Sequence, residues 1–258
     1  MTAKIVYFDI ETSPNIVYTW GAGYEENVIE VIEPWFMISF AYRWEGEPAK
    51  NTKCVIVTPE EALARDDSRV VEALRDVLDE CDIAVAHNGD RFDKKKFNAR
   101  LIKHGFGPPQ PYRTIDTLKV ARGNFQFNSN KLDDLGEYLD VGRKVKHEGF
   151  GLWKACMNGD PAALDRMAKY NIGDITLLRN VYMKLRPFMP THPNLALYGD
   201  IDSCPKCGAH RSNLTRRGYR YTNLTKKVVW HCKACNGYSS SRLPVSAKVE
   251  PRPERVSV

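Results

Sequence analysis

The sequence predicts an α/β fold with a mixed β-sheet flanked by helices, followed by a small cysteine-rich module. Strand-like segments come first and later alternate with segments of helical periodicity, which is typical of a mixed sheet. Four of the seven cysteines gather in two close pairs near the carboxyl end. The 258 residues are 43% hydrophobic, which is ordinary for a globular protein of one or two domains.

The expected elements follow from apolar periodicity. Segments rich in β-branched and aromatic residues predict strands at residues 4–10, 35–44, 54–57, 83–87 and 113–116. Apolar residues at helical spacing predict helices around residues 70–78, 97–102 and 132–139. The segments between the first three strands are polar or contain Gly46 and Pro48, which favours an antiparallel meander.

The longest expected helix closes the main domain. Pro161 suits a first helical position, and the helix should end before Pro187. We therefore expect a main domain over residues 1–190 and a cysteine-rich module over residues 200–243. Residues 244–258 are polar, charged and without periodicity, so we expect a disordered tail there.

Charge and hydropathy narrow the functional classes. No apolar run approaches 18 residues and the start does not look like a secretory signal, so we expect a cytoplasmic protein without membrane spans. Residues 200–258 carry 12 Lys/Arg and 4 Asp/Glu, whereas the preceding residues carry 26 and 28. A basic end on a near-neutral body suggests a polyanionic partner, although a solvated basic tail is the alternative.

Two acidic residues lie two positions apart at the end of the first expected strand. Because strand side chains alternate, Asp9 and Glu11 point to one face, and Val6, Phe8 and Ile10 point to the other, into a core. Buried like charges repel, and protons or cations relieve the repulsion. The alternative is an edge strand with a solvated face, which the apolar character of the whole strand disfavours.

Three further residues complete a candidate set. Asp93 follows an expected strand and opens a helix, where a lone Asp would be interpreted as an N-cap. Tyr170 and Asp174 are four apart on the last helix and share a face. A solvated Asp beside a half-buried Tyr is the alternative, but Leu177 and Val181 continue the same row and indicate that it is partly buried.

The order of these motifs resembles the DEDD superfamily of RNase H-like 3′–5′ exonucleases, in its tyrosine-bearing subclass. Phe-Asp-Ile-Glu-Thr at residues 8–12, His-Asn-Gly-Asp-Arg-Phe-Asp at 87–93 and Tyr-Asn-Ile-Gly-Asp at 170–174 are similar to its three motifs. Lys-Leu-Asp-Asp-Leu at residues 131–135 resembles a segment of family B polymerase exonuclease domains. The resemblance covers roughly residues 4–185, and three motifs in order are more specific than any one.

The resemblance implies a five-stranded mixed sheet and a mechanism with two Mg²⁺ or Mn²⁺ ions. By matching positions, Asp9, Glu11 and Asp174 would hold one ion, and Asp9 with Asp93 would help to hold the second. Oxygen ligands suit such ions, which activate water and stabilise the leaving oxygen. Tyr170 would orient the attacking water.

The resemblance also implies roles for residues beside the metal ligands. Thr12 and Asn88 would contact the terminal nucleotide. Phe92 is expected in the core, and Asp116 and Asp133 are expected as turn or cap residues rather than metal ligands.

The paired cysteines predict a structural Zn²⁺ site. The two Cys-x-x-Cys pairs are Cys204, Cys207, Cys232 and Cys235. Four thiolates complete a tetrahedral zinc shell, and the intervening 24 residues resemble a zinc ribbon. The scattered cysteines are expected to be buried thiols: Cys54, Cys81 and Cys156.

Cations and aromatic residues interleave in this module. The basic residues are Arg211, Arg216, Arg217, Arg220, Lys226 and Lys227, and the aromatic residues are Tyr219, Tyr221 and Trp230. Cations that pair with phosphates and rings that stack on bases suit a single strand. The alternatives are a small aromatic core with a solvated surface, or a protein partner such as a DNA polymerase or a single-strand binding protein.

Together these patterns predict a metal-dependent 3′–5′ exonuclease that releases nucleoside monophosphates from single-stranded DNA. The length leaves no room for a polymerase domain, so we expect a stand-alone enzyme. An exoribonuclease or a structure-selective nuclease of the same fold is an alternative. A catalytically inactive nucleic-acid-binding adaptor is another, which loss of a metal ligand would indicate, but all four carboxylates and the tyrosine are present.

Overall fold

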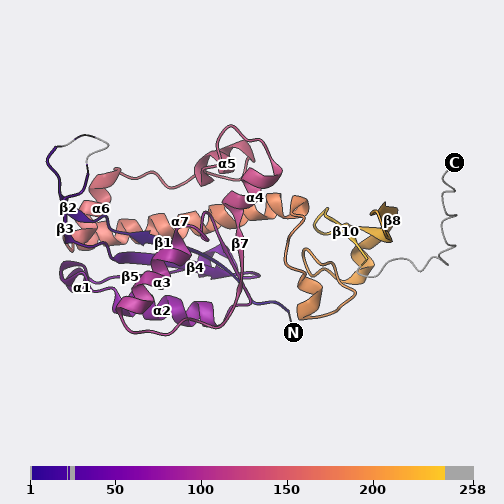
Figure 1. Ribbon diagram of the computed structural model, residues 1–258, viewed down its shortest axis with the longest axis horizontal. Helices are drawn as coiled ribbons and strands as arrows, with labels where there is room; N and C mark the ends of the chain where they lie inside the picture. Colours follow the sequence, from indigo (N-terminus) through magenta and orange to yellow (C-terminus); the bar gives the residue numbers. More distant parts are fainter. Residues whose placement is uncertain (1, 22, 24–26, 242–258) are drawn as a thin grey trace, which may run out of the picture. The chain divides into compact units, whose positions relative to one another are not determined.

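The computed structural model describes residues 2–21, 23 and 27–241, in two compact units (Figure 1). One unit is Ala3–Leu185, and the other consists of Thr2 and the described residues from Arg186 onward, which include the four paired cysteines. The tail expected at residues 244–258 lies outside the described residues. None of the helices in the described ranges combines the length and apolar character needed to cross a membrane.

The first unit is built on a five-stranded mixed sheet in the order β5-β4-β1-β6-β7. The strands are β1 (Ile5–Thr12), β4 (Met37–Trp44), β5 (Lys53–Ile56), β6 (Ile83–Ala86) and β7 (Arg113–Asp116). β1, β4 and β5 pair antiparallel, whereas β6 is parallel to both β1 and β7. The expected mixed sheet is therefore confirmed, with the antiparallel meander on one side of β1.

Seven α-helices accompany this sheet in the described part of the first unit. They are α1 (Pro59–Ala64), α2 (Ser68–Asp79), α3 (Asp93–Lys103), α4 (Thr117–Asn124), α5 (Leu132–Tyr138), α6 (Phe150–Met157) and α7 (Pro161–Leu185). Figure 1 shows α2 and α7 on opposite sides of the strands. The sequence did not predict α1, α4 and α6, or the hairpin of β2 (Ile16–Tyr18) and β3 (Glu30–Glu33). These elements have three to eight residues each, which is too short for a clear period.

The central strand β1 is buried on both faces, and its even-numbered and odd-numbered side chains point to opposite faces of the sheet. Val6, Phe8 and Ile10 join the apolar cluster that includes the buried residues of α2 and α3. Tyr7 instead stacks edge-on against Tyr182 of α7, with 5.7 Å between ring centroids. The odd-numbered positions of β1, which include both of its acidic residues, therefore face α7.

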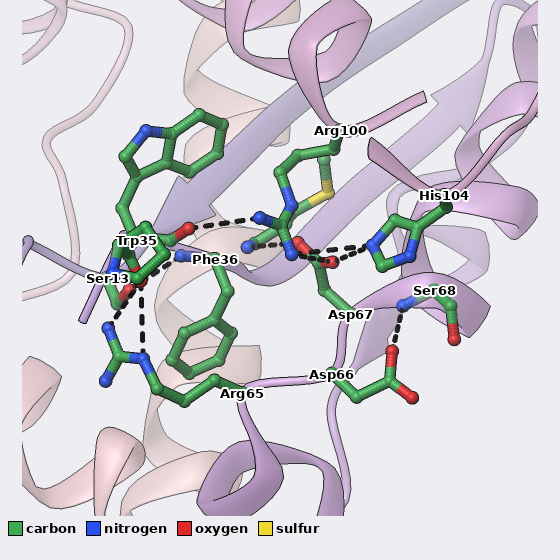
Figure 2. Close-up of polar contacts among 11 residues, drawn as sticks. Ser13, Trp35, Phe36, Arg65, Asp66, Asp67, Ser68, Arg100 and His104 are labelled. Carbon is green, nitrogen blue, oxygen red and sulfur yellow. Dashed lines mark hydrogen bonds and ion pairs between the residues drawn. The ribbon is translucent and has the colours of Figure 1, made fainter. Parts of the chain in front are cut away.

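A buried ion-pair network fixes the helix α3, which begins with Asp93. Figure 2 shows the Asp67 carboxylate between Arg100, in the last turn of α3, and His104, the residue that follows this helix. One Asp67 oxygen accepts from the Arg100 guanidinium and lies 2.6 Å from His104 Nε2, and the other accepts from the backbone N–H of Met37 at 2.6 Å. Asp67, His104 and the adjacent Asp66 have ligand types that suit a metal. Because both Asp67 oxygens already accept hydrogen bonds from protein groups, we interpret this cluster as structural.

Replacing Asp67 with alanine is expected to lower the free energy of unfolding by about 3–5 kcal/mol, because it leaves a buried guanidinium without its counter-ion. The side chains of Asp67 and Arg100 are 0% and 4% exposed. Urea denaturation measures the change. Asp76→Ala removes an exposed partner of Arg75 on α2 and should leave the midpoint nearly unchanged. Equal midpoints for the two variants would contradict the structural role of the network.

The second unit contains an antiparallel three-stranded sheet in the order β10-β9-β8. Its strands are β8 (Leu214–Tyr221), β9 (Lys226–Cys232) and β10 (Tyr238–Ser240). The 3₁₀ helices among the described residues of this unit are Arg186–Phe188, Leu195–Tyr198 and Arg211–Asn213, and Ala49–Asn51 is a 3₁₀ helix of the first unit. The buried core around the sheet is formed by cysteines with Ala209 and Leu214. A small sheet closed by a four-cysteine cluster is the arrangement of a zinc ribbon.

Candidate metal-binding active site

Three carboxylates from two elements converge on the α7 face of the sheet. Asp9 and Glu11 come from β1 and Asp174 comes from α7, and one oxygen of each lies within 4.8 Å of the others. Asn171, also on α7, donates its side-chain N–H to Asp9 Oδ2 at 2.9 Å, which holds that carboxylate toward the helix. The three carboxylates to which the family resemblance assigns one ion therefore lie close together in the structure.

Asp93 lies beside this group rather than within it. Its Oδ1 accepts the backbone N–H of Ile10 at 3.1 Å, so it is held next to the acidic end of β1. Its side chain is buried, and its charge contributes to the raised pKa of Asp9. The position suits a ligand that shares a second ion with Asp9.

Burial and mutual repulsion make these carboxylates weak acids. Burial raises the pKa of Glu11 and of Asp93 to about 7. Burial, followed by repulsion from Asp93, Glu11 and Asp174, raises the pKa of Asp9 well above its ordinary value. The pKa of Asp174 is also raised by burial. A concentrated negative potential of this kind favours bound cations.

One oxygen of the cluster has no protein partner. Asp174 Oδ1 is buried and has no hydrogen-bond partner among the described residues, although its carboxylate lies beside two others. A buried acceptor without a donor is costly unless a cation or water satisfies it. The acceptor-only oxygen donors here fit a hard divalent ion.

Lys144 supplies the positive charge that contacts the cluster. Its Nζ donates to Asp174 Oδ2 at 2.6 Å and to the Tyr170 hydroxyl at 3.0 Å. Burial alone would lower the Lys144 pKa, but attraction to Asp174 and Asp9 outweighs it, and the pKa is raised. The sequence did not indicate this residue, because it lies in a loop between α5 and α6 where no periodicity predicts which side chains point inward.

Replacing Lys144 with methionine is expected to lower the melting temperature of the Mg²⁺-free protein by several degrees at about pH 8. The change removes a cation from buried carboxylates, and ~1 kcal/mol shifts the melting temperature of a domain this size by ~2–4 °C. Added Mg²⁺ should restore most of the loss. Lys146→Met, which removes an exposed lysine of the same loop, is the control. A melting temperature that Mg²⁺ fails to restore would contradict the proposed ion site.

Aromatic side chains hold the Tyr170 ring. The ring centroids of His147 and Trp153 lie 4.8 and 5.9 Å from that of Tyr170. Trp153 also makes a side-chain hydrogen bond to Glu11 that lowers the pKa of that carboxyl against the larger effect of burial.

The predicted burial of the α7 face is confirmed, because Tyr170, Asp174, Leu177 and Val181 are all buried.

The residues expected beside the motifs lie in different surroundings. Thr12 Oγ1 accepts from Lys96 Nζ at 3.1 Å, and the backbone N–H of Asn88, at φ 66°, donates to Asp116 Oδ1. Asp116 is the N-cap of α4, as expected. The core assignment of Phe92 is wrong, because its side chain is 39% exposed at the start of α3 and faces the Lys96 ammonium.

The four paired cysteines form a second candidate metal site. The Sγ atoms of Cys204 and Cys235 are 3.8 Å apart, and those of Cys207 and Cys232 are 3.7 Å apart. A tetrahedral ion with Zn–S bonds of about 2.3 Å places its sulfurs about 3.8 Å apart. All four sulfurs lie within 4.8 Å of one another, so the cluster fits Zn²⁺ without rearrangement.

The chain is similar to parts of two DNA polymerases. The chain is 27% identical over 194 residues to the PolC-type DNA polymerase III of Ureaplasma parvum serovar 3, covering 72% of this chain and 13% of that protein. The structure resembles the family B DNA polymerase of Pyrobaculum calidifontis, with a TM-score of 0.54, 18% identity, and coverage of 72% of this chain and 25% of that one. The chain thus spans a small part of each relative.

A family model supplies the assignment. The model of the RNase H superfamily matches residues 42–186, a segment that begins after β1 and contains Asp93, Tyr170 and Asp174. It covers more than half of the chain, and it includes β5, β6 and β7 of the mixed sheet and the whole of α7. The chain belongs to the RNase H superfamily.

Proposed function

We propose that the protein is a two-metal-ion 3′–5′ exonuclease that hydrolyses single-stranded DNA and releases nucleoside monophosphates. The observation that carries this proposal is the convergence of Asp9, Glu11 and Asp174, with Asp93 beside them, on the sheet of an RNase H superfamily domain. Groups of acceptor-only oxygens around a buried, unsatisfied carboxylate suit divalent ions and phosphate chemistry.

Each carboxylate has a defined place in the proposal. Asp9, Glu11 and Asp174 would hold one Mg²⁺ or Mn²⁺ ion, and Asp9 and Asp93 would share the second. Two such ions supply an activated water and stabilisation of the leaving 3′ oxygen in an in-line displacement. Asn171 orients the shared carboxylate of Asp9 through its 2.9 Å hydrogen bond.

Tyr170 and Lys144 act on the attacking side of the proposed reaction. The Tyr170 hydroxyl is directed into the site by its ring contacts and by the 3.0 Å hydrogen bond from Lys144. Burial raises the Tyr170 pKa, so its O–H stays protonated and can donate to or orient a water. Thr12 and Asn88 would contact the terminal nucleotide.

The choice of DNA rests on the relatives, which are named as DNA polymerases. The basic second unit adds attraction for a polyanion, since residues 200–241 carry eight Lys/Arg and two Asp/Glu. In the same proposal, the four-cysteine cluster holds one structural Zn²⁺.

Digestion of a single-stranded DNA oligonucleotide labelled at its 5′ end tests the reaction and its polarity. With Mg²⁺ or Mn²⁺ we expect a ladder that shortens one nucleotide at a time, and with EDTA an intact substrate. A 5′-labelled RNA of the same sequence serves as the competing substrate. Preferential digestion of the RNA would replace the proposal by an exoribonuclease, and intact nucleic acid under all conditions would leave an adaptor without catalysis.

A further inference from the structure

One face of the three-stranded sheet gathers the aromatic and basic residues of the second unit. In the register of β8 and β9, Arg216 lies opposite Trp230 and Tyr221 lies opposite Lys226. Directly opposite residues share a face of a sheet. A bulge at Arg217 restores the alternation, so that Tyr219, opposite Val228, points to the same side. With Arg211 beside Trp230, the aromatic–basic face consists of Tyr221, Lys226, Tyr219, Arg216, Trp230 and Arg211.

Rings and cations alternate along this face. Lys226 Nζ lies 4.0 Å from the centroid of the Tyr219 ring and 5.6 Å from that of the Tyr221 ring. The Arg216 guanidinium lies 4.8 Å from the Tyr219 centroid and donates to the Tyr219 hydroxyl. At the other end, the Arg211 guanidinium lies 4.6 Å from the Trp230 centroid. Every ring of the face is therefore accompanied by a positive charge.

These rings do not form the core of the unit. The buried apolar cluster around the sheet consists of the cysteines with Ala209 and Leu214, and no aromatic residue of the described chain belongs to it. Tyr219 and Tyr221 remain 38% and 68% exposed. The small aromatic core that the sequence left open as an alternative is therefore absent from the described part of this unit. Exposed rings beside cations are available to a ligand.

A groove continues the aromatic–basic face at its Trp230 end. It has a volume of about 580 Å³ and is lined by Trp230, Arg211 and Leu214, with Ser239 of β10 and Asp202 also on its wall. Pockets of about 300–1,000 Å³ hold small organic ligands, so a nucleotide fits. The ring and the guanidinium offer stacking and phosphate contacts, and the serine and aspartate side chains offer hydrogen bonds to a base edge.

We propose that the aromatic–basic face binds single-stranded DNA, with successive bases on Tyr221, Tyr219 and Trp230 and with one nucleotide in the groove. Lys226, Arg216 and Arg211 then pair with the phosphates between these bases. A charge of eight Lys/Arg against two Asp/Glu over residues 200–241 matches a polyanion, and the flat rings suit unpaired bases rather than a duplex. This inference extends the proposed nuclease by a second binding site for the same substrate.

Fluorescence anisotropy of a labelled oligothymidylate of about 20 nucleotides tests the role of the rings. All variants carry Asp9→Asn to suppress cleavage, and Mg²⁺ is left out. Tyr219→Ala/Tyr221→Ala should weaken binding by roughly tenfold or more, because the stacking of one base on one aromatic ring changes the affinity by about tenfold. Tyr238→Ala is the matched control, because Tyr238 is 56% exposed on the opposite face. Zinc content and circular dichroism verify that each variant is folded.

The salt dependence of the same binding tests the cations. Arg216→Ala/Lys226→Ala should reduce the slope of log K against log salt by about 0.7 for each lost phosphate contact. Arg220→Ala/Lys227→Ala removes the same charge from the opposite face, where these two residues lie opposite each other. It should leave the slope nearly unchanged.

The outcomes separate this inference from the proposed nuclease. Two results would overturn the aromatic–basic face as the binding site. One is an equal reduction of the salt slope in Arg216→Ala/Lys226→Ala and Arg220→Ala/Lys227→Ala. The other is unchanged binding in Tyr219→Ala/Tyr221→Ala. Binding to an RNA oligonucleotide at least tenfold tighter than to DNA would overturn the choice of DNA. Because binding is measured without catalysis, a protein that shows these binding losses but no nuclease activity would contradict only the proposed function.

Discussion

Replacing Asp9 with asparagine is expected to lower the rate of DNA cleavage by at least about 10³-fold, because Asp9 would contact both ions. Stabilisation of transition-state charge by bound ions amounts to several kcal/mol, and each 1.36 kcal/mol changes the rate tenfold. Rates are measured on single-stranded DNA at saturating Mg²⁺. Asp76→Asn, an acidic residue on the surface of α2, is the control. A rate within tenfold of wild type for Asp9→Asn would contradict the assignment.

The Asp9→Asn variant should also make the stability of the protein depend less on pH. The raised pKa values of Asp9, Glu11 and Asp93 mean that the folded protein binds protons more tightly than the unfolded chain above about pH 4. Their contribution to the free energy of unfolding therefore falls as the pH rises through about 7. Without added Mg²⁺, wild type should lose more melting temperature between about pH 5 and pH 8 than Asp9→Asn. Equal losses of melting temperature in wild type and Asp9→Asn would contradict a cluster of buried carboxylates that repel one another.

Replacing Cys204 with serine is expected to unfold the second unit and to remove its zinc. Binding of a structural zinc contributes on the order of 10–16 kcal/mol in small zinc modules, more than a sheet of three short strands can supply through its apolar core. We expect zinc to fall from one ion per chain to nearly none, together with weaker DNA binding. Proteolysis should degrade the chain after Arg186 and spare Ala3–Leu185.

Cys81→Ser is the matched control for this change, because Cys81 is a buried thiol of the first unit and contributes no sulfur to the cluster. Its zinc content should stay at one ion per chain. Retention of a full zinc ion in Cys204→Ser would contradict the four-cysteine ligand set.

Residue alternation and spacing predicted the part of the candidate site that rests on regular elements. A period of two on β1 places Asp9 and Glu11 together, and a spacing of four on α7 places Tyr170 and Asp174 together. The family motifs then indicate that strand and helix meet, and Tyr7 of β1 does contact Tyr182 of α7 in the structure. Long elements with one buried face are predictable because the period itself encodes the face.

Side chains that depend on loops or long-range contacts could not be predicted in this way. Lys144 reaches the carboxylates from an irregular loop, and Asn171 contacts Asp9 across 162 positions of sequence. The sequence analysis did not single out Asp67, because its partners Arg100 and His104 lie 33 and 37 positions later in the sequence. Such contacts depend on how elements pack, which no local pattern records. The aromatic–basic face required the register of β8 and β9 to show which rings share a side.

The proposed metal sites are tested most directly by a crystal structure of the protein soaked with Mn²⁺, with anomalous maps measured at the manganese and zinc edges. We expect two manganese peaks about 4 Å apart, one among Asp9, Glu11 and Asp174 and one between Asp9 and Asp93, and a zinc peak among the four cysteines. Manganese at Asp67 and His104 instead, or no peak at the carboxylates of β1, would contradict a two-metal nuclease site.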